Sequence, residues 1–208
     1  MANQDAPFGF RAIGGMGSSY ETQGTSQYQI ADNSTSAIFQ GDLCMWGNSA
    51  SSATDANSVA VAVGFISVSA VTEDTLNIGV FNGCFYNDPT TLKPTWKNYY
   101  PGAVNVASGQ TIDAFVFDNP QQLYVAQTAG TFTQTDACSL VDQDTYAAGS
   151  TINGQSACEL AGTSKVTTGQ WRIIRISEDP SNSDTGSANS NWVVRLNESI
   201  YYNLGVLS

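Results

Sequence analysis

The chain has 208 residues, enough for one large domain or two small ones, and a chain of this length buries roughly 70% of its unfolded surface on folding. It contains no histidine, which excludes Ser-His-Asp and Cys-His catalysis and the usual histidine-containing zinc sites. Seven basic residues stand against eighteen acidic ones, for a net charge of −11, so nucleic acid is not an expected partner, because its binding depends on clustered Lys and Arg.

The N-terminal region is predicted to carry no targeting signal. The opening MANQDAPFGF lacks the basic start and the apolar core of a secretory signal, and no apolar run is long enough to cross a bilayer. We therefore expect a soluble protein, made in a cytoplasm, with no membrane partner. Residues 1–26 are predicted to form an extended arm, in which Phe8 and Phe10 are apolar anchors and the Gly-rich stretch at 13–19 is a flexible arm or turn.

From residue 27 onward the pattern predicts an all-β protein. Helical periodicity is nearly absent, and short runs rich in β-branched and aromatic residues recur between clusters of Gly, Asn, Asp and Ser. The predicted strands are 27–31, 37–39, 42–46, 59–71, 77–86, 112–117, 122–127, 171–176 and 192–197.

The stretch GVFNGCFYNDPTTLKPTWKNYYPG, at 79–102, is the densest aromatic region of the chain. The pair Asn82-Gly83 interrupts its apolar residues, which predicts a kink or a turn in the strand. A loop made stiff by two prolines follows, and then come Trp96, Tyr99 and Tyr100. Because aromatic burial stabilises both cores and interfaces, these rings belong either to the core or to a contact with another chain.

Residues 27–208 are predicted to form a single β domain with a loop-rich insertion around 129–168, since that segment is polar and weakly patterned. Cys44 and Cys84 stand in apolar strand-like contexts and are expected to be free, buried thiols. Cys138 and Cys158 lie in a polar region and could form a disulfide if the folded protein meets an oxidising exterior.

The motifs that resemble catalytic or metal sites are incomplete. In GQSAC, at 154–158, Ser156 has no histidine to activate it, so the motif predicts a tight polar turn. The oxygen donors Asp179, Asn182 and Asp184 begin like a calcium loop, but the spacing is wrong and no Glu closes it. Carboxylate pairs such as Glu178-Asp179 and Asp142-Asp144 are typical of exposed turns. We therefore predict no catalytic residue, no metal and no cofactor.

Seven pieces in this order resemble a family of tailed-bacteriophage virion proteins, the small capsid decoration or cement proteins. The pieces are DAPFGFR (5–11), YQIADNSTSAIFQGDLC (28–44), the aromatic stretch at 79–102, IDAFVFDNPQQLYVAQ (112–127), NGQSACEL (153–160), RIIRISEDPSNS (172–183) and NWVVRLNESIY (191–201). They touch most of the chain, and no single piece is a sharp motif. The sequence departs from the family in the lengths of the loops near 129–137 and 162–168.

The resemblance implies a β-sandwich or β-barrel of jelly-roll type, without catalytic residues. It implies a homotrimer on the outer surface of the capsid, bound to the major capsid protein, which clamps neighbouring capsomers after synthesis in the host cytoplasm. An acidic surface agrees with an outer position, since packaged DNA would repel it. On this basis the candidate interface residues are Phe8, Phe10, Arg11, Trp96, Tyr99 and Tyr100.

Two other functions stay open at this stage. A virion fibre or adhesion module could bind host-surface carbohydrate through aromatic side chains and through the polar loop at 177–190. An enzyme with two catalytic carboxylates, such as a glycan hydrolase, is the third alternative, and the absence of histidine and of a distinctive acid pair disfavours it.

Overall fold

The computed structural model describes residues 3–16, 24–50, 64–68, 77–164 and 167–201. Eleven β-strands and one short 3-10 helix form in these ranges, with no α-helix among them. The elements are β1 Arg11–Gly15, β2 Ser26–Ile30, β3 Leu43–Ala50, β4 Gly64–Val68, β5 Asn77–Asn87, β6 Pro94–Lys97, β7 Ile112–Phe117, β8 Gln122–Gln127, η1 Gln134–Asp136, β9 Leu140–Val141, β10 Trp171–Ile176 and β11 Asn191–Leu196. The predicted all-β class is confirmed, and the arrangement is consistent with a β-sandwich or barrel.

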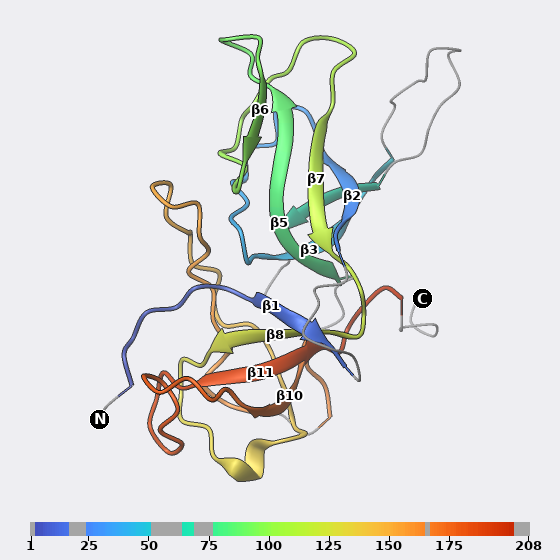
Figure 1. Ribbon diagram of the computed structural model, residues 1–208. Coiled ribbons are helices and arrows are strands. Elements are labelled where there is room, and N and C mark those ends of the chain that lie inside the picture. Colours follow the sequence, from blue (N-terminus) through green and yellow to red (C-terminus); the bar gives the residue numbers. More distant parts are fainter. Residues whose placement is uncertain (1–2, 17–23, 51–63, 69–76, 165–166, 202–208) are drawn as a thin grey trace.

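The strands form two sheets, which occupy the two halves of the molecule (Figure 1). The five-stranded sheet has the order β1-β8-β11-β10-β9, and all its pairings are antiparallel. The six-stranded sheet has the order β3-β4-β2-β7-β5-β6, with one parallel pair, β2 and β4. An additional pairing of β3 with β5 curls this second sheet on itself like a partial barrel.

Each sheet has its own hydrophobic core. The five-stranded sheet buries large aromatic side chains, and the six-stranded sheet buries mainly aliphatic side chains and tyrosines. The first core includes Phe10, Tyr124, Phe132, Trp171 and Trp192; the second includes Ile30, Ile78, Tyr100, Ile112 and Val116. Leu43 and Val80 come from strands of the six-stranded sheet but belong to the aromatic core, so β3 and β5 tie the two halves together.

Three strands are missing from the predicted set, namely β1, β6 and the two-residue β9, and each is short or atypical. RAIGG of β1 has two glycines and weak β-propensity, and it forms by pairing with the edge of β8. β6 begins at Pro94 on the edge of its sheet, where proline is tolerated because no neighbour needs its missing N–H. Within the extended arm predicted over 1–26, residues 11–15 form β1, which the sequence pattern did not indicate.

The remaining predictions agree with the strands to within a few residues where the structure describes the chain. Strands β7, β8 and β10 have the predicted bounds, whereas 37–39 forms only an isolated bridge from Ile38 to Tyr100. Of the predicted strand at 59–71, residues 59–63 and 69–71 lie outside the described residues. The predicted kink at Asn82-Gly83 is confirmed: the pairing of β5 with β7 shifts register between Phe81 and Gly83, which leaves Asn82 as the extra residue of a β-bulge.

Candidate functional site

The six residues predicted for an interface do not lie together. Tyr100 is fully buried in the core of the six-stranded sheet, where its hydroxyl donates to the Ser34 carbonyl at 2.9 Å and accepts from the Val104 N–H at 3.2 Å. The prediction that Tyr100 is available to a partner is therefore wrong. Its ring packs inward because the backbone bridge between Ile38 and Tyr100 fixes that segment against the core.

Phe10 is also a core residue. It is 1% exposed, and its ring stacks on Trp171 with the ring centres 4.1 Å apart and the planes within 14°. Its backbone N–H donates to the Gly41 carbonyl at 2.9 Å. The prediction of Phe10 as an interface residue is wrong, because the aromatic core of its own chain takes up the ring.

The preceding residues also pack on their own chain. The backbone N–H of Gln4 donates to Asn182 Oδ1, and the amide of Gln127 both accepts from the Ala6 N–H and donates to the Gln4 carbonyl. Asn3 donates from its side chain to carbonyls of the loop at 184–188. The loop at 177–190, expected as the polar site of an adhesion module, thus directs much of its hydrogen bonding to the N-terminal segment.

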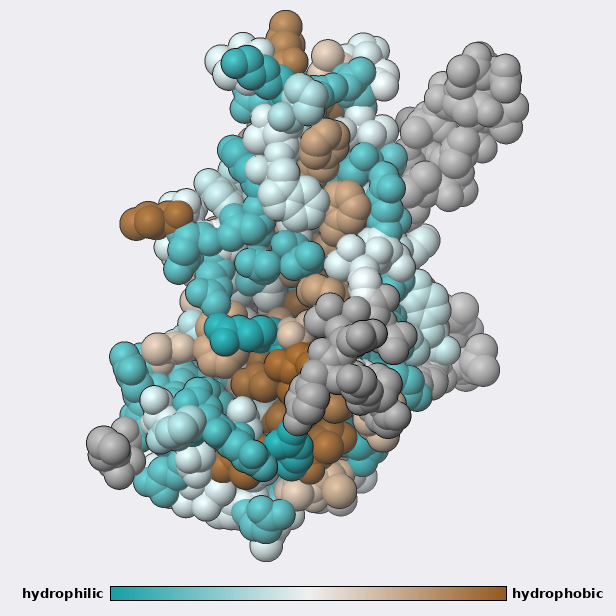
Figure 2. All heavy atoms as spheres, in the orientation of Figure 1, coloured by the Kyte–Doolittle hydropathy of each residue, from teal (hydrophilic) through white to brown (hydrophobic). Residues whose placement is uncertain are grey.

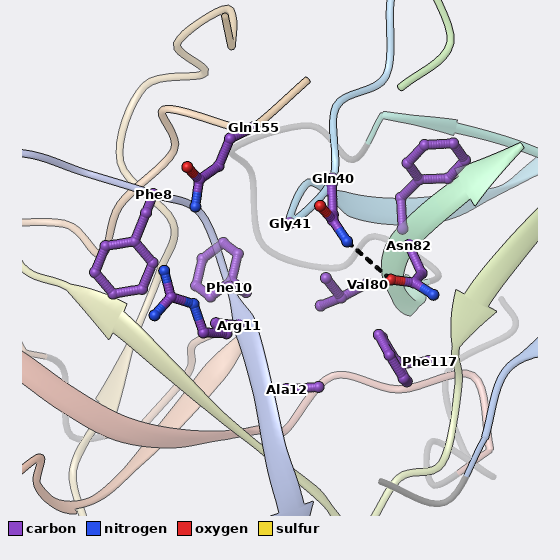
Figure 3. Close-up of a pocket in the computed structure, with 11 residues that line it drawn as sticks. Phe8, Phe10, Arg11, Ala12, Gln40, Gly41, Val80, Asn82, Phe117 and Gln155 are labelled. Carbon is purple, nitrogen blue, oxygen red and sulfur yellow. Dashed lines mark hydrogen bonds between the residues drawn. The ribbon is translucent and has the colours of Figure 1, made fainter. Parts of the chain in front are cut away.

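Phe8 and Arg11 do reach the surface, and they flank a cleft between the two sheets. The guanidinium carbon of Arg11 lies 4.6 Å from the centre of the Phe8 ring, a cation–π contact. The cleft has a volume of about 300 Å³. Its floor is apolar, and three side-chain amides, from Gln40, Asn82 and Gln155, line it as well (Figure 3).

Trp96 lies on the outer face of the six-stranded sheet, where it is 52% exposed. Its ring centre is 5.1 Å from that of Phe115 on β7, and its strand partner on β5 is Phe85, itself exposed. Gly83 lies beneath the indole: a Cβ on this residue would approach the Trp96 ring to 2.6 Å. Phe85, Trp96 and Phe115 form an outward aromatic strip, and apolar atoms interrupt the hydrophilic surface over this half of the molecule (Figure 2).

Tyr99 is half-buried beside this region rather than within the strip. Its ring stacks on Phe39 with the centres 5.6 Å apart, and the Lys97 ammonium lies 5.9 Å from the ring centres of both Tyr86 and Tyr99. The aromatic stretch at 79–102 therefore divides between core, in Tyr86 and Tyr100, and surface, in Phe85 and Trp96.

A buried carboxyl group, that of Asp42, follows Gly41 of the cleft directly in the sequence. Asp42 is fully buried, and its Oδ2 accepts from the Phe39 N–H at 2.8 Å and from the Tyr146 hydroxyl at 3.4 Å. Its Oδ1 accepts from the Cys158 thiol at 3.6 Å, and Ser156 also bonds to the carboxyl. Burial raises the pKa of Asp42 above its ordinary value and raises the pKa of Cys158 to about 12.

The remaining motifs form no reactive site in the part of the chain described. Ser156 is buried and accepts from the Cys158 N–H, as in a tight turn. Asp142 is buried rather than exposed, and its carboxyl accepts from the Gln170 N–H. Among the described residues no three His, Cys, Asp or Glu side chains are grouped to hold a metal, and Asp179 binds within its own loop and to Asn191. All four cysteines are free: Cys138 is exposed and the other three are buried.

Comparisons with protein-family models, with curated proteins and with solved structures found no match. The described residues also contain no helix long and apolar enough to span a membrane. Sequence reasoning missed Gln40, Asn82 and Gln155 as a group. The bulge signal at Asn82-Gly83 marked one of them, but three amides so far apart in the sequence gave no sign that they would meet.

Proposed function

We propose that this chain is a structural protein of a bacteriophage virion, which binds the outer surface of the capsid as a homotrimer and cements neighbouring capsomers. The observation that carries the proposal is the outward aromatic strip of Phe85, Trp96 and Phe115. Half-exposed aromatic rings on a rigid sheet are suited to burial against a partner, and aromatic residues are enriched in interface cores. Seven sequence pieces resemble decoration proteins in their order, and from this resemblance we infer that the partner is the major capsid protein.

Two further features support this role. The net charge of −11 favours a position away from packaged DNA. The aromatic strip lies on paired strands, since β6 and β7 both pair with β5, so its rings are already held in place and lose little conformational freedom on binding.

The direct test is cryo-electron microscopy of capsids incubated with the purified chain. Trimeric density on the outer shell is expected, with the outer face of the six-stranded sheet against a capsomer or a sister subunit. Density confined to a tail or fibre would instead favour the alternative function, an adhesion module for host-surface carbohydrate.

A matched pair of variants tests the strip itself. We expect Trp96→Ala to lower capsid occupancy or trimer formation at least tenfold, which is the loss of a typical aromatic interface anchor. Ile152→Ala, at an isoleucine that is 98% exposed in a turn outside the strands, is the control and should leave occupancy unchanged. Equal occupancy for Trp96→Ala and wild type would show that the strip is not part of the interface.

A further inference from the structure

The cleft between the two sheets is lined by apolar side chains and by polar groups that have no part in the proposed cementing role. Phe8, Arg11 and Ala12 come from the N-terminal segment and β1, Asn82 comes from β5, and Phe117 ends β7 (Figure 3). Small-molecule sites are concave and combine apolar side chains with a few polar groups, and the volume of about 300 Å³ is at the lower end of their usual range. The cleft is therefore large enough for a small ring compound.

The amides of the cleft have unused hydrogen-bonding capacity. Gln40 Nε2 donates to Asn82 Oδ1 at 3.0 Å, and neither side chain makes another hydrogen bond to a described residue. Gln40 thus keeps an acceptor and Asn82 a donor. The side-chain amide of Gln155 makes no hydrogen bond to any described residue, so it contributes both a donor and an acceptor.

The backbone holds these amides in place. The bulge at Asn82 adds one residue to β5 beside the cleft, and bulges commonly redirect a side chain next to a binding site. Gln40 and Gln155 lie side by side in a parallel bridge, in which the Gln40 N–H donates to the Gly154 carbonyl and the Ser156 N–H donates to the Gln40 carbonyl. Three segments distant in sequence therefore present amides from a fixed frame.

The chemistry of the lining selects the ligand. Neutral amides that both donate and accept match hydroxyl groups, each of which also does both. The half-buried rings of Phe8 and Phe117 offer apolar surface for the C–H face of a sugar ring. Among the described residues that line the cleft there is no carboxylate or lysine, and Arg11 is the one charged side chain. A protein of net charge −11 repels polyanions, whereas a neutral polyol meets no such barrier.

We propose that this cleft is a carbohydrate-binding site for a neutral or singly acidic sugar unit, with Gln40, Asn82 and Gln155 bonding its hydroxyls and Phe8 contacting its ring. Arg11, stacked on Phe8, donates to a ring substituent, including the carboxylate of a uronic acid. The site is separate from the aromatic strip, so it adds to the cementing function and does not depend on it. It also differs from the loop at 177–190 that the sequence suggested for sugars.

The test uses the full chain, labelled with 15N and titrated with glucose, galactose, mannose, N-acetylglucosamine and glucuronic acid, with glycerol as the non-specific polyol. We expect saturable shifts of the Gln40, Asn82 and Gln155 side-chain amide signals for at least one sugar, with a Kd of about 1 mM or tighter. Glycerol should give no saturable shift. Failure of all five sugars to saturate, or equal binding of glycerol, would overturn the proposal.

Variants locate the binding. Gln155→Ala should weaken it about five- to tenfold, the loss of one hydrogen bond, without changing the fold, because this side chain has no partner among the described residues. Gln134→Ala, at an exposed glutamine of η1 outside the cleft, is the matched control and should bind like wild type. Undiminished binding by Gln155→Ala and by Arg11→Ala would place the sugar elsewhere. Gln155→Ala should also keep wild-type capsid occupancy, which separates this test from that of the cementing role.

Discussion

The four tryptophans of the chain divide between the two sheets. Trp171 and Trp192, in the five-stranded sheet, are completely buried, and Trp171 is stacked on Phe10 and in edge contact with Tyr124. Trp46 and Trp96, in the six-stranded sheet, are respectively half-buried and exposed. The same residue type therefore stabilises the interior of one half and forms surface in the other.

The difference follows from which side chains each strand turns inward. In β7 the burial alternates strictly, with Ile112, Ala114 and Val116 inside, so Phe115 faces out. Phe85 of β5 lies on that same outer face, since it pairs with Asp113 of β7, and Trp96 of β6 lies there because it pairs with Phe85. In β11, by contrast, four consecutive residues starting at Asn191 are buried, so both faces of this strand are covered along that stretch. Whether an aromatic residue is buried therefore depends on whether other parts of the chain cover its face of the sheet.

The largest expected effect is that of Trp171→Ala. Truncation leaves a cavity against Phe10 and Tyr124, and we expect a loss of roughly 3–5 kcal/mol in the free energy of unfolding. Trp96→Ala, with half of the indole already in water, should cost about 1 kcal/mol. Urea unfolding followed by circular dichroism measures both. Similar losses for the two variants would contradict the division of the tryptophans into core and surface.

Asp42→Ala is expected to have the next largest effect, at the point where the halves join. It removes the acceptor for the Phe39 N–H and for the Tyr146 and Cys158 side chains, and leaving buried donors unpaired should cost roughly 2–4 kcal/mol. The measurement is again urea unfolding. A loss below that of Trp96→Ala would mean that the carboxyl group is dispensable to the junction.

The pH dependence of stability provides a smaller and more specific test of the same group. Because burial raises the folded-state pKa of Asp42, its contribution to stability is fully present below the unfolded-state pKa and is lost as pH rises through the folded-state value. Asp42→Asn does not titrate and keeps the shape. We therefore expect wild type to lose stability relative to Asp42→Asn as pH rises above the ordinary Asp pKa of about 3.9. A difference that is constant with pH would contradict a raised pKa.

Sequence reasoning succeeded where the local pattern decides the structure. Strands β7, β8 and β10 are short runs rich in β-branched and aromatic residues, bounded by polar and turn-forming residues, and their bounds were predicted correctly. The bulge at Asn82 was visible because Asn-Gly interrupts an apolar run. These features depend on a few adjacent residues, so the sequence contains the information directly.

The candidate site could not be predicted in the same way, since long-range contacts decide it. Nothing local distinguishes Phe8 from Phe10, yet the stacking partner of Phe10, Trp171, lies far along the chain and buries only that ring. Tyr99 and Tyr100 are likewise adjacent, and the bridge to Ile38 turns Tyr100 inward. The cleft depends on the meeting of Gln40, Asn82 and Gln155, which requires the whole fold to be known.

Thiol reactivity tests the difference between the two halves of the molecule with the smallest perturbation, because it requires no substitution. Cys44 and Cys84 lie in the core of the six-stranded sheet and Cys158 lies in that of the five-stranded sheet, while Cys138 is exposed. Burial raises the pKa of Cys84 and of Cys158 to about 12, so neither forms appreciable thiolate at pH 8 in the folded protein. With Ellman's reagent we expect one fast thiol in buffer and four in concentrated urea.

At intermediate urea the same reagent distinguishes the two halves. If the two cores open independently, Cys158 and the pair Cys44 and Cys84 become reactive at different urea concentrations, as local unfolding units do. If Leu43 and Val80 couple the cores as their packing indicates, all three thiols become reactive in one transition. Peptide mapping of the labelled cysteines separates these outcomes. We expect the single transition, since β3 and β5 contribute to both cores and neither half can open without exposing apolar surface of the other.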